Sequence, residues 1–155
     1  MTTSYFEIAP HVMDGTFASA KYVSQSGLEE SLIDLVNIRA SLINGCAFCL
    51  ELHYREARAN GEKDERLATI GAWRDAQFFS DRERAALLWT EYVTLIASKP
   101  ITEGEERFVR AQLTEKELID LTLSITTINT WNRFNVAFHN QPNPAFRTPR
   151  SMAHA

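Results

Sequence analysis

The sequence predicts an all-α fold, and three observations support this prediction. Four Ser/Thr-x-x-Glu capping boxes, the pattern of a helix N-terminus, are spread along the chain. Apolar residues after the first box recur at helical spacing, and no segment shows the polar–apolar alternation of a strand. Gly or Pro stands where several periodic segments stop. The four boxes are Ser26/Glu29, Ser80/Glu83, Thr102/Glu105 and Thr114/Glu117.

The predicted helices form one compact domain without repeats or an internal linker. An early helix begins near Pro10, and the helix opened by Ser26 runs to Asn44-Gly45. The next helix carries both cysteines and ends at Asn60-Gly61, so these two form a helical hairpin. Later helices are predicted at about 64–73, at about 81–98, shortly after Thr102, and at about 115–139. We expect a single helical domain over residues 1–140 and an extended Pro-containing tail over residues 141–155.

The composition is that of an ordinary globular protein and argues against several classes of function. The chain is 45% hydrophobic and 23% charged, with a net charge of −4. No run of Lys and Arg offers the surface that phosphate binding requires, so nucleic acid is not an expected partner. No stretch of about 18 apolar residues and no basic leader is present, so we expect no membrane partner and no export. The expected compartment is the cytoplasm, where thiols are kept reduced.

The last predicted helix has two apolar faces, although a surface helix needs only one. Either this helix is the central element of the bundle, or its second face contacts another subunit, and the two interpretations are compatible. We expect a homo-oligomer. One face carries Leu118, Leu121, Ile125 and Ile128, and the nearly opposite face carries Leu123, Trp131, Phe134 and Phe138.

The chain has two cysteines, Cys46 and Cys49, and His53 follows four residues after the second. If Gly45 ends one helix and Cys46 opens the next, both sulfurs lie in the first turn, where unpaired N–H groups and the helix dipole favour a thiolate. The spacing i, i+3, i+7 puts both thiols and the imidazole on one helical face. Cys49, at i−4 from His53, is slightly preferred as the attacking thiol. A second thiol one turn away can then capture a sulfenic acid before irreversible oxidation.

Asp34 is the fourth candidate site residue. It lies ten residues before the Asn44 turn, and His53 lies eight or nine residues after it. Because each helical residue rises about 1.5 Å, antiparallel helices place these two side chains at similar heights. Asp34 could then accept a proton through His53 or a bridging water, which completes a carboxylate, imidazole and thiol in series. The alternative is a solvated carboxylate near Arg39 or Arg55.

Three interpretations of the cysteine pair are open at this point. The pair is redox-active, binds a metal, or consists of inert buried thiols. A zinc site would use Cys46, Cys49, His53 and Asp34, but their spacing differs from the two separated ligand pairs of a zinc finger. A thioredoxin-like domain is disfavoured because no βαβ pattern surrounds the C-x-x-C motif. We prefer the redox interpretation, with no metal and no other cofactor.

The segment from Leu35 to Gly61 resembles the core of the alkyl hydroperoxidase D-like family, which belongs to the carboxymuconolactone decarboxylase superfamily. The segment consists of a helix, a Gly-Cys-x-x-Cys-x-x-x-His start, and a second helix closed by Gly. The similarity continues at Trp73-Arg74, at residues 78–86 and at residues 128–133, so it covers most of the chain.

This resemblance implies a thiol-dependent peroxidase, an oxidoreductase of antioxidant type. The cysteine matching Cys49 attacks the O–O bond and becomes a sulfenic acid, and the one matching Cys46 resolves it to a disulfide. A dithiol reductant, for example a lipoylated or thioredoxin-like protein, then restores the thiols. The resemblance also implies a homo-oligomer, a trimer or a hexamer. The alternative function is a non-catalytic redox-sensing or metal-binding oligomer on the same fold.

Two positions depart from the family pattern. Asp34 stands where the family has a proton-relay glutamate, so the side chain is one methylene shorter. Phe48 replaces a histidine immediately before the attacking cysteine, so an aromatic replaces one polar group of the site. The decarboxylase branch lacks the cysteine pair, which makes lactone chemistry a poor interpretation of this chain.

Trp131 and Arg133 in the last helix are secondary candidates. If that segment approaches the hairpin, Trp131 would form a wall of the peroxide pocket and Arg133 would favour the Cys49 thiolate. The preferred alternative for Arg133 is a salt bridge at a subunit interface.

Overall fold

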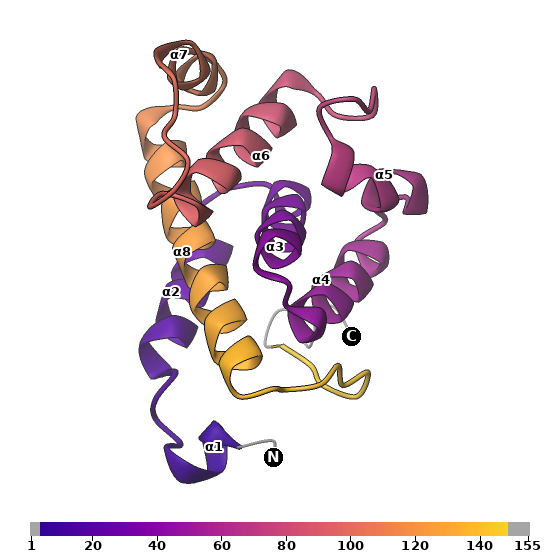
Figure 1. The fold of residues 1–155 in the computed structure, drawn as a ribbon, viewed down its shortest axis with the longest axis vertical. Coiled ribbons are helices and arrows are strands. Elements are labelled where there is room, and N and C mark those ends of the chain that lie inside the picture. Colours follow the sequence, from indigo (N-terminus) through magenta and orange to yellow (C-terminus); the bar gives the residue numbers. More distant parts are fainter. Residues whose placement is uncertain (1–3, 149–155) are drawn as a thin grey trace.

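The structure, a computed structural model, describes residues 4–148, and every regular element in that range is a helix (Figure 1). The all-α prediction is therefore confirmed. In chain order the elements are α1 (Tyr5–Ile8), α2 (Asp14–Ser24), α3 (Glu30–Asn44), α4 (Ala47–Ala59), α5 (Asp64–Thr69), the 3₁₀ turn η1 (Ile70–Ala72), α6 (Asp81–Thr94), α7 (Glu103–Gln112) and α8 (Glu115–Ala137).

Three of the four predicted capping boxes open a helix. Ser80, Thr102 and Thr114 precede α6, α7 and α8, and each hydroxyl accepts a hydrogen bond from the backbone N–H of the Glu three residues later. The carboxylate of that Glu accepts in turn from the backbone N–H of the capping residue. Each box satisfies two N–H groups that a helix start otherwise leaves unpaired, so these boundaries are set locally.

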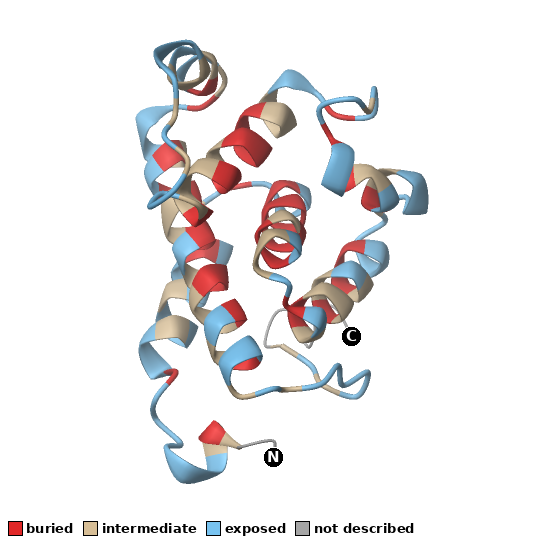
Figure 2. Cartoon of the chain, viewed as in Figure 1, coloured by how far each residue is buried: buried red, intermediate tan, exposed pale blue. Residues whose placement is uncertain are grey.

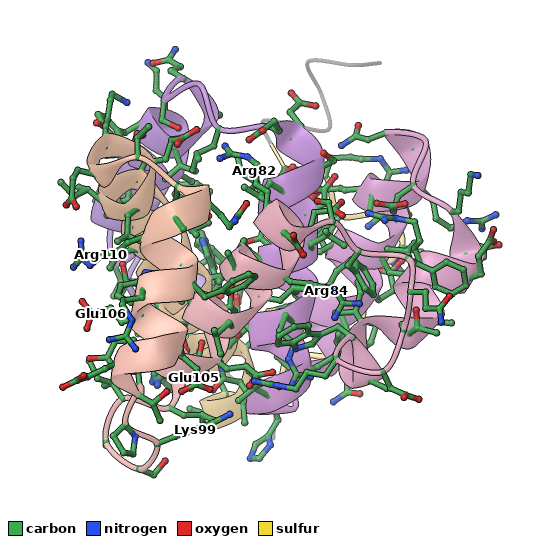
Figure 3. All side chains as sticks on the ribbon, turned by 90° about the horizontal axis from the view of Figure 1, so that it is seen from above. Arg82, Arg84, Lys99, Glu105, Glu106 and Arg110 are labelled. Atoms are coloured by element: carbon green, nitrogen blue, oxygen red, sulfur yellow. The ribbon has the colours of Figure 1, made fainter. Side chains whose placement is uncertain are left out.

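The fourth predicted box, Ser26/Glu29, is wrong. The helix begins directly after Glu29, with no capping hydrogen bond from a side chain. The Ser26 hydroxyl instead donates to the carbonyl of Val23 at 2.8 Å, which closes the end of α2. The Glu29 carboxylate accepts two hydrogen bonds of 2.9 Å from the guanidinium of Arg82, at the start of α6 (Figure 3). Both side chains of the expected box therefore have other partners.

Several other boundaries differ by a few residues. The helix predicted near Pro10 is two helices, α1 before it and α2 beginning at Asp14. The helix predicted to end near Ser98 stops at Thr94, and residues 95–98 form turns. The end of the predicted 64–73 helix is the 3₁₀ turn η1. Helix ends are the part of an element that local propensity determines least.

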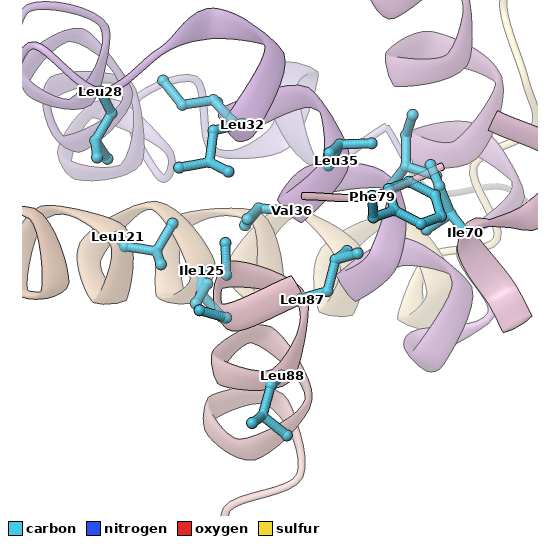
Figure 4. Close-up of a cluster of buried hydrophobic side chains, with 14 of the residues drawn as sticks. Leu28, Leu32, Leu35, Val36, Ile70, Phe79, Leu87, Leu88, Leu121 and Ile125 are labelled. Atoms are coloured by element: carbon cyan, nitrogen blue, oxygen red, sulfur yellow. The ribbon is translucent and has the colours of Figure 1, made fainter. Parts of the chain in front are cut away.

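The centre of the molecule is α3, which Figures 1 and 2 show between α4, α6 and α8. Residues 32–38 are buried without interruption, as happens when a helix is covered on all sides. Figure 4 shows the resulting core, in which Val36 lies between Leu87 of α6 and Ile125 of α8. This core holds α3 and α8 in place, and both helices contribute to the site described below.

Both apolar faces of α8 have contacts within the chain, but only the first is buried, while the residues of the second are half-buried. Leu121 and Ile125 belong to the core around α3. On the second face, Trp131 makes an edge-on contact with Phe17 of α2, with ring centroids 5.0 Å apart. The Phe134 ring lies 5.2 Å from the Tyr5 ring of α1. The central element is therefore α3, and α8 lies between it and the N-terminal helices, while oligomerisation remains a prediction.

A buried carboxylate, Glu91 of α6, joins three parts of the fold. It is 2% exposed and accepts hydrogen bonds of 2.8 Å from Arg39 of α3, from Trp73 and Arg74 after η1, and from Lys99 after α6. Burial raises the pKa of Glu91, but the hydrogen bonds from Arg74, Lys99 and Trp73 outweigh it and hold this pKa well below its usual range. Glu91 is therefore ionised and paired with several cations.

The segment after α8 runs back toward α4 (Figure 1). Its described part, residues 141–148, contains a turn at Pro144-Ala145, so it is not uniformly extended as predicted. Pro149 and the rest of the predicted tail lie outside the described residues. Among the helices that the structure describes, none is long and apolar enough to cross a membrane.

Candidate thiol site

The turn between α3 and α4 places both cysteines at a helix start, as the sequence predicts. Gly45 adopts a φ of 65°, a left-handed conformation that ends α3 and that residues with a Cβ rarely adopt. Cys46 is the N-cap of α4, and its sulfur accepts the backbone N–H of Cys49 at 3.3 Å. A cysteine sulfur thus fills the position that Ser, Thr, Asp or Asn usually takes at an N-cap.

The two thiols are free and almost completely buried. Cys46 is 1% exposed and Cys49 2%. They form a small cluster with Ala40 and Ile128, against which Phe48 and Trp131 pack. Trp131 therefore lies beside the thiols, while its role as a wall of a peroxide pocket stays a prediction. Any reagent must displace part of this cover to reach sulfur.

Arg133, by contrast, donates to the backbone oxygen of Asn129 at 3.0 Å and to its side-chain oxygen at 2.7 Å. It is exposed. In the structure its guanidinium therefore stabilises its own helix, and the α8 residues that hydrogen-bond the sulfurs are Asn132 and Asn135.

Two buried asparagines of α8 hydrogen-bond the sulfurs. Asn132 bonds both Cys46 and Cys49, donates to the Ser41 hydroxyl at 3.0 Å, and accepts from Asn44 at 2.9 Å. Asn135 donates to the Cys49 sulfur at 3.4 Å. The three-residue spacing on α8 matches that of the cysteines on α4, so packing two helices side by side brings both amides to the thiol pair.

Hydrogen bonding makes the two thiols unequal. The hydrogen bond from the Cys49 thiol lowers the pKa of Cys46 to about 7; burial opposes this, and the Cys49 N–H and Asn132 add to it. The pKa of Cys49 is raised, because its thiol bonds Cys46 and because it is buried. The first proton therefore leaves Cys46, and the resulting thiolate is held by the thiol of Cys49.

His53 is paired with a carboxylate that the sequence analysis did not select. Its Nδ1 lies 3.0 Å from Oε2 of Glu56, three residues later on α4. Both side chains are largely buried, His53 being 12% and Glu56 5% exposed. The i, i+3 spacing on a helix was a signal that would have found this pair.

Asp34 is buried rather than solvated, so the alternative of a helix-face carboxylate beside Arg39 or Arg55 is wrong. It is 1% exposed, and its Oδ2 accepts from the side-chain amide of Asn60 at 3.0 Å, at the far end of the hairpin. The two arginines have other partners, Glu91 for Arg39 and Glu51 for Arg55. The proton relay from Asp34 to His53 stays a prediction.

Tyr5 covers the Cys49 end of the site and was also missed. Its hydroxyl donates to the side-chain oxygen of Asn135 at 3.3 Å, and Asn140 donates to the same oxygen at 2.8 Å. Burial, followed by the negative potential of Cys49, raises the pKa of Tyr5 to about 12; the hydrogen bond from Asn140 partly offsets this rise. No sequence signal links residue 5 to this site.

The segment after α8 closes the other side. The Phe146 ring meets the Phe48 ring at 64°, with centroids 5.4 Å apart. Arg55 donates to the carbonyl of Phe146 at 3.1 Å, and the Thr148 hydroxyl donates to Glu56, the partner of His53. This segment therefore covers Phe48 and the histidine–glutamate pair.

The geometry does not favour the zinc interpretation. Within residues 4–148, no three His, Cys, Asp or Glu side chains are grouped as a metal ion requires. His53 pairs with Glu56 and Asp34 with Asn60.

A groove of about 590 Å³ is present elsewhere in the molecule, and neither cysteine lines it. The residues that line it are Ile38, Leu42, Leu50, Glu51, Tyr54, Arg55, Arg58 and Leu67.

A buried dithiol at the start of the second helix of a hairpin, inside an all-α domain, is the arrangement that the resemblance to alkyl hydroperoxidase D-like proteins implies, and comparisons with known proteins agree. The model of the carboxymuconolactone decarboxylase family matches residues 10–92, and the chain belongs to this family. It is 40% identical over 138 residues to YdfG, an uncharacterized protein of Bacillus subtilis (strain 168), covering 89% of this chain and 94% of YdfG.

Solved structures confirm the fold. A protein of unknown function from Agrobacterium tumefaciens, provisionally described as the antioxidant defence protein AhpD, is 35% identical. It superimposes with a TM-score of 0.88 over 92% of this chain and 97% of its own. A variant of the debrominase Bmp8, in complex with 2,3,4-tribromopyrrole, has a TM-score of 0.76 at 16% identity, covering 96% of this chain and 76% of Bmp8. At that identity the likeness shows the fold alone.

Proposed function

We propose that this protein is a thiol-dependent peroxidase that reduces hydroperoxides through a dithiol–disulfide cycle of Cys46 and Cys49. The observation that carries the proposal is the free cysteine pair itself, in which the sulfurs are one helical turn apart and the pKa of Cys46 is lowered to about 7. Membership of the carboxymuconolactone decarboxylase family, and the 35% identity to the structure provisionally described as an antioxidant defence protein, support the same chemistry.

The cycle has three balanced steps. A cysteine thiolate attacks the O–O bond of the hydroperoxide; with one proton, it yields an alcohol and a cysteine sulfenic acid. The second thiol attacks the sulfenic sulfur, which releases water and forms the disulfide. A dithiol reductant, a lipoylated or thioredoxin-like protein, then transfers two electrons and two protons and leaves as its own disulfide.

Cys49 is proposed as the attacking thiol and Cys46 as the resolving one. The low pKa of Cys46 is compatible with this order, because a Cys46 thiolate bonded to the Cys49 thiol can accept its proton as Cys49 attacks. The reverse order, in which the Cys46 thiolate attacks directly, is the competing version. It uses the same pair and differs in which sulfur carries the sulfenic acid.

His53 is proposed as the group that moves the proton to the departing alcohol, held by Glu56 and assisted by Asp34. The Nδ1 contact with Glu56 leaves Nε2 free of that carboxylate for a proton in transit. Asp34, buried on the facing helix, would accept the proton from His53 through a bridging water or after a small movement of the hairpin.

The preferred substrate is an organic hydroperoxide. Phe48 and Trp131 pack against the sulfurs, and a cover of aromatic rings suits an apolar substituent better than it suits hydrogen peroxide. The same rings would accept a flat halogenated ring, and Bmp8 shares the fold. Reductive dehalogenation, in which the dithiol gives a disulfide, a hydrogen halide and the reduced ring, is therefore the second candidate.

Intact-mass spectrometry tests the proposal. The reduced protein is treated with one equivalent of cumene hydroperoxide, and Cys46→Ser and Cys49→Ser variants are treated in parallel. We expect wild type to lose two hydrogens and Cys46→Ser to form a dimedone adduct that Cys49→Ser lacks. An adduct in Cys49→Ser alone would reverse the order, and a protein unchanged by excess peroxide would refute the peroxidase.

Turnover separates an enzyme from a redox sensor. With dihydrolipoamide as donor, an enzyme consumes many equivalents of hydroperoxide per chain, whereas a sensor oxidises once and stops. Release of bromide from tribromopyrrole under the same conditions tests the second candidate.

A further inference from the structure

The amide of Asn135 can present either its oxygen or its NH₂ group to the Cys49 sulfur, and these alternatives have opposite effects. An N–H donor stabilises a thiolate, whereas an oxygen acceptor repels it and favours the thiol. In the structure Asn135 donates to this sulfur, at 3.4 Å. The amide is 3% exposed, so water cannot decide its orientation.

Two hydrogen-bond donors meet on the other end of the amide. The Tyr5 hydroxyl lies 3.3 Å and the Asn140 amide nitrogen 2.8 Å from the Asn135 side-chain oxygen. Turning the amide over would place its NH₂ group against the NH₂ group of Asn140, which loses that bond, and would force the Tyr5 hydroxyl to accept instead of donate. The orientation of the Asn135 amide beside Cys49 is therefore set by Tyr5 and Asn140, whose hydrogen bonds go to Asn135 and not to Cys49.

Tyr5 is well placed to hold this arrangement. It is 5% exposed, and its ring packs against Phe134 and Phe138 of α8 at 5.2 Å and 5.7 Å. Phe134 directly precedes Asn135 on α8, and Phe138, the C-cap of that helix, follows Asn135 by three residues. The phenol is fixed by ring packing, and its hydroxyl points to the Asn135 oxygen.

We propose that Tyr5 is a positioning residue of the thiol site: its hydroxyl, with Asn140, holds the Asn135 amide so that an N–H donor faces the Cys49 sulfur. The inference deepens the proposed function and rests on it for its biological meaning. It assigns a role to a residue more than 40 positions from either cysteine. The hydroxyl matters here, whereas the ring serves packing.

The test measures thiolate formation at Cys49 without any peroxide. In a Cys46→Ser background Cys49 is the only thiol, and its alkylation by iodoacetamide is followed by intact mass from pH 6 to pH 10. The rate follows the thiolate fraction, so a raised thiol pKa displaces the profile to higher pH. Tyr5→Phe keeps the ring and removes the hydroxyl. Tyr22→Phe is the matched control, because it removes a phenol that bonds Asp120, away from the sulfurs.

We expect Tyr5→Phe to slow alkylation about three- to tenfold on the rising part of the profile, with Tyr22→Phe unchanged. This change in rate corresponds to a rise of about half to one unit in the pKa of Cys49, caused by the weaker hydrogen-bond network around Asn135. Asn140→Ala is expected to slow the reaction in the same direction. If Tyr5 only covered the site, losing its hydrogen bond to Asn135 would loosen α1 and make alkylation faster. The direction of the change in alkylation rate therefore separates the two roles.

A double-mutant comparison identifies the route. In an Asn135→Ala background, Tyr5→Phe is expected to have no further effect. An unchanged or faster rate in Tyr5→Phe, or the same loss in both backgrounds, would overturn the proposal. If Asn135→Ala does not fold, as circular dichroism would show, the single variants Tyr5→Phe and Asn140→Ala decide the matter by their sign.

The same experiment keeps this inference apart from the peroxidase proposal. Slower alkylation in Tyr5→Phe together with a protein inert to hydroperoxide would leave Tyr5 as a positioning residue and refute the peroxidase. Rapid oxidation by hydroperoxide with no effect of Tyr5→Phe on alkylation would support the peroxidase and refute the positioning role of Tyr5.

Discussion

The backbone N–H of Cys49 donates to the sulfur of Cys46 at 3.3 Å, so one cysteine caps the helix that carries the other. This contact couples the chemistry of the site to the start of α4. A thiolate on Cys46 strengthens the cap, and a disulfide must loosen it, because the sulfur then bonds Cys49 through its side chain instead. Oxidation is therefore expected to loosen the first turn of α4.

The pH dependence of the oxidation is the first prediction. Because the pKa of Cys46 is lowered to about 7, about half of the pair carries a thiolate at pH 7 and about a tenth at pH 6. The rate of disulfide formation with cumene hydroperoxide should fall about fivefold between these pH values. Stopped-flow tryptophan fluorescence can measure it, and a rate that stays flat down to pH 5 would contradict the assigned thiolate.

Asn132 should matter for the acidity of Cys46. Asn132→Ala removes a hydrogen bond to this sulfur, so the pKa of Cys46 should rise and the pH–rate profile should move up by about half to one unit. Asn129→Ala is the matched control, since Asn129 is a buried amide one turn earlier on α8 that donates to Thr94 and Ile125 and accepts from Asn44 and Arg133, and none of these bonds is to a sulfur. Equal displacements of the pH–rate profile in Asn132→Ala and Asn129→Ala would count against a specific role of Asn132 at Cys46.

The Glu56 carboxylate should be needed for the function of His53. Glu56→Gln keeps the size of the side chain and removes the charge that faces Nδ1, and we expect the oxidation to slow by about tenfold. Glu51→Gln, which breaks a pair with Arg55 on the same helix, is the control and should leave the rate within about twofold. Single-turnover oxidation, followed by intact mass, measures both. Equal rates in all three proteins would remove Glu56 from the mechanism.

Glu91 should control acid stability rather than activity. Glu91→Gln removes a buried charge that Arg39, Arg74 and Lys99 share, and should lower the free energy of unfolding by about 3 kcal/mol at pH 7. The pKa of Glu91 is depressed in the folded state, so its contribution is present above the ordinary value of 4.5 and is lost as pH falls below it. Urea unfolding at several pH values should show a smaller acid loss in the variant. A parallel loss in both proteins would show that other carboxylates dominate.

Much of the fold follows from short-range signals. Three capping boxes open helices because a Ser or Thr and a Glu three residues later satisfy each other's backbone, whatever lies around them. The box at Ser26 does not form: the Ser26 hydroxyl closes α2, and the Glu29 carboxylate pairs with Arg82, 53 residues away. A distant ion pair does not by itself prevent capping, because Glu83 and Glu117 cap their helices while they also pair with Arg66 and Arg82.

The candidate site divides in the same way. The placement of Cys46, Cys49 and His53 on the first turns of one helix was predictable, since it depends on Gly45 and on helical spacing. The pairing of His53 with Glu56 was also within reach of helical spacing. The burial of Asp34 was not, because it results from the packing of α3 among three other helices.

The sequence by itself determined the helices, the hairpin and the dithiol at its turn, because all of these depend on contacts within a few residues along the chain. Only the tertiary structure decided which groups surround the sulfurs. Asn135 reaches Cys49 across 86 residues, and Tyr5 reaches Asn135 across 130. Such contacts depend on how the helices pack, and no local spacing encodes them.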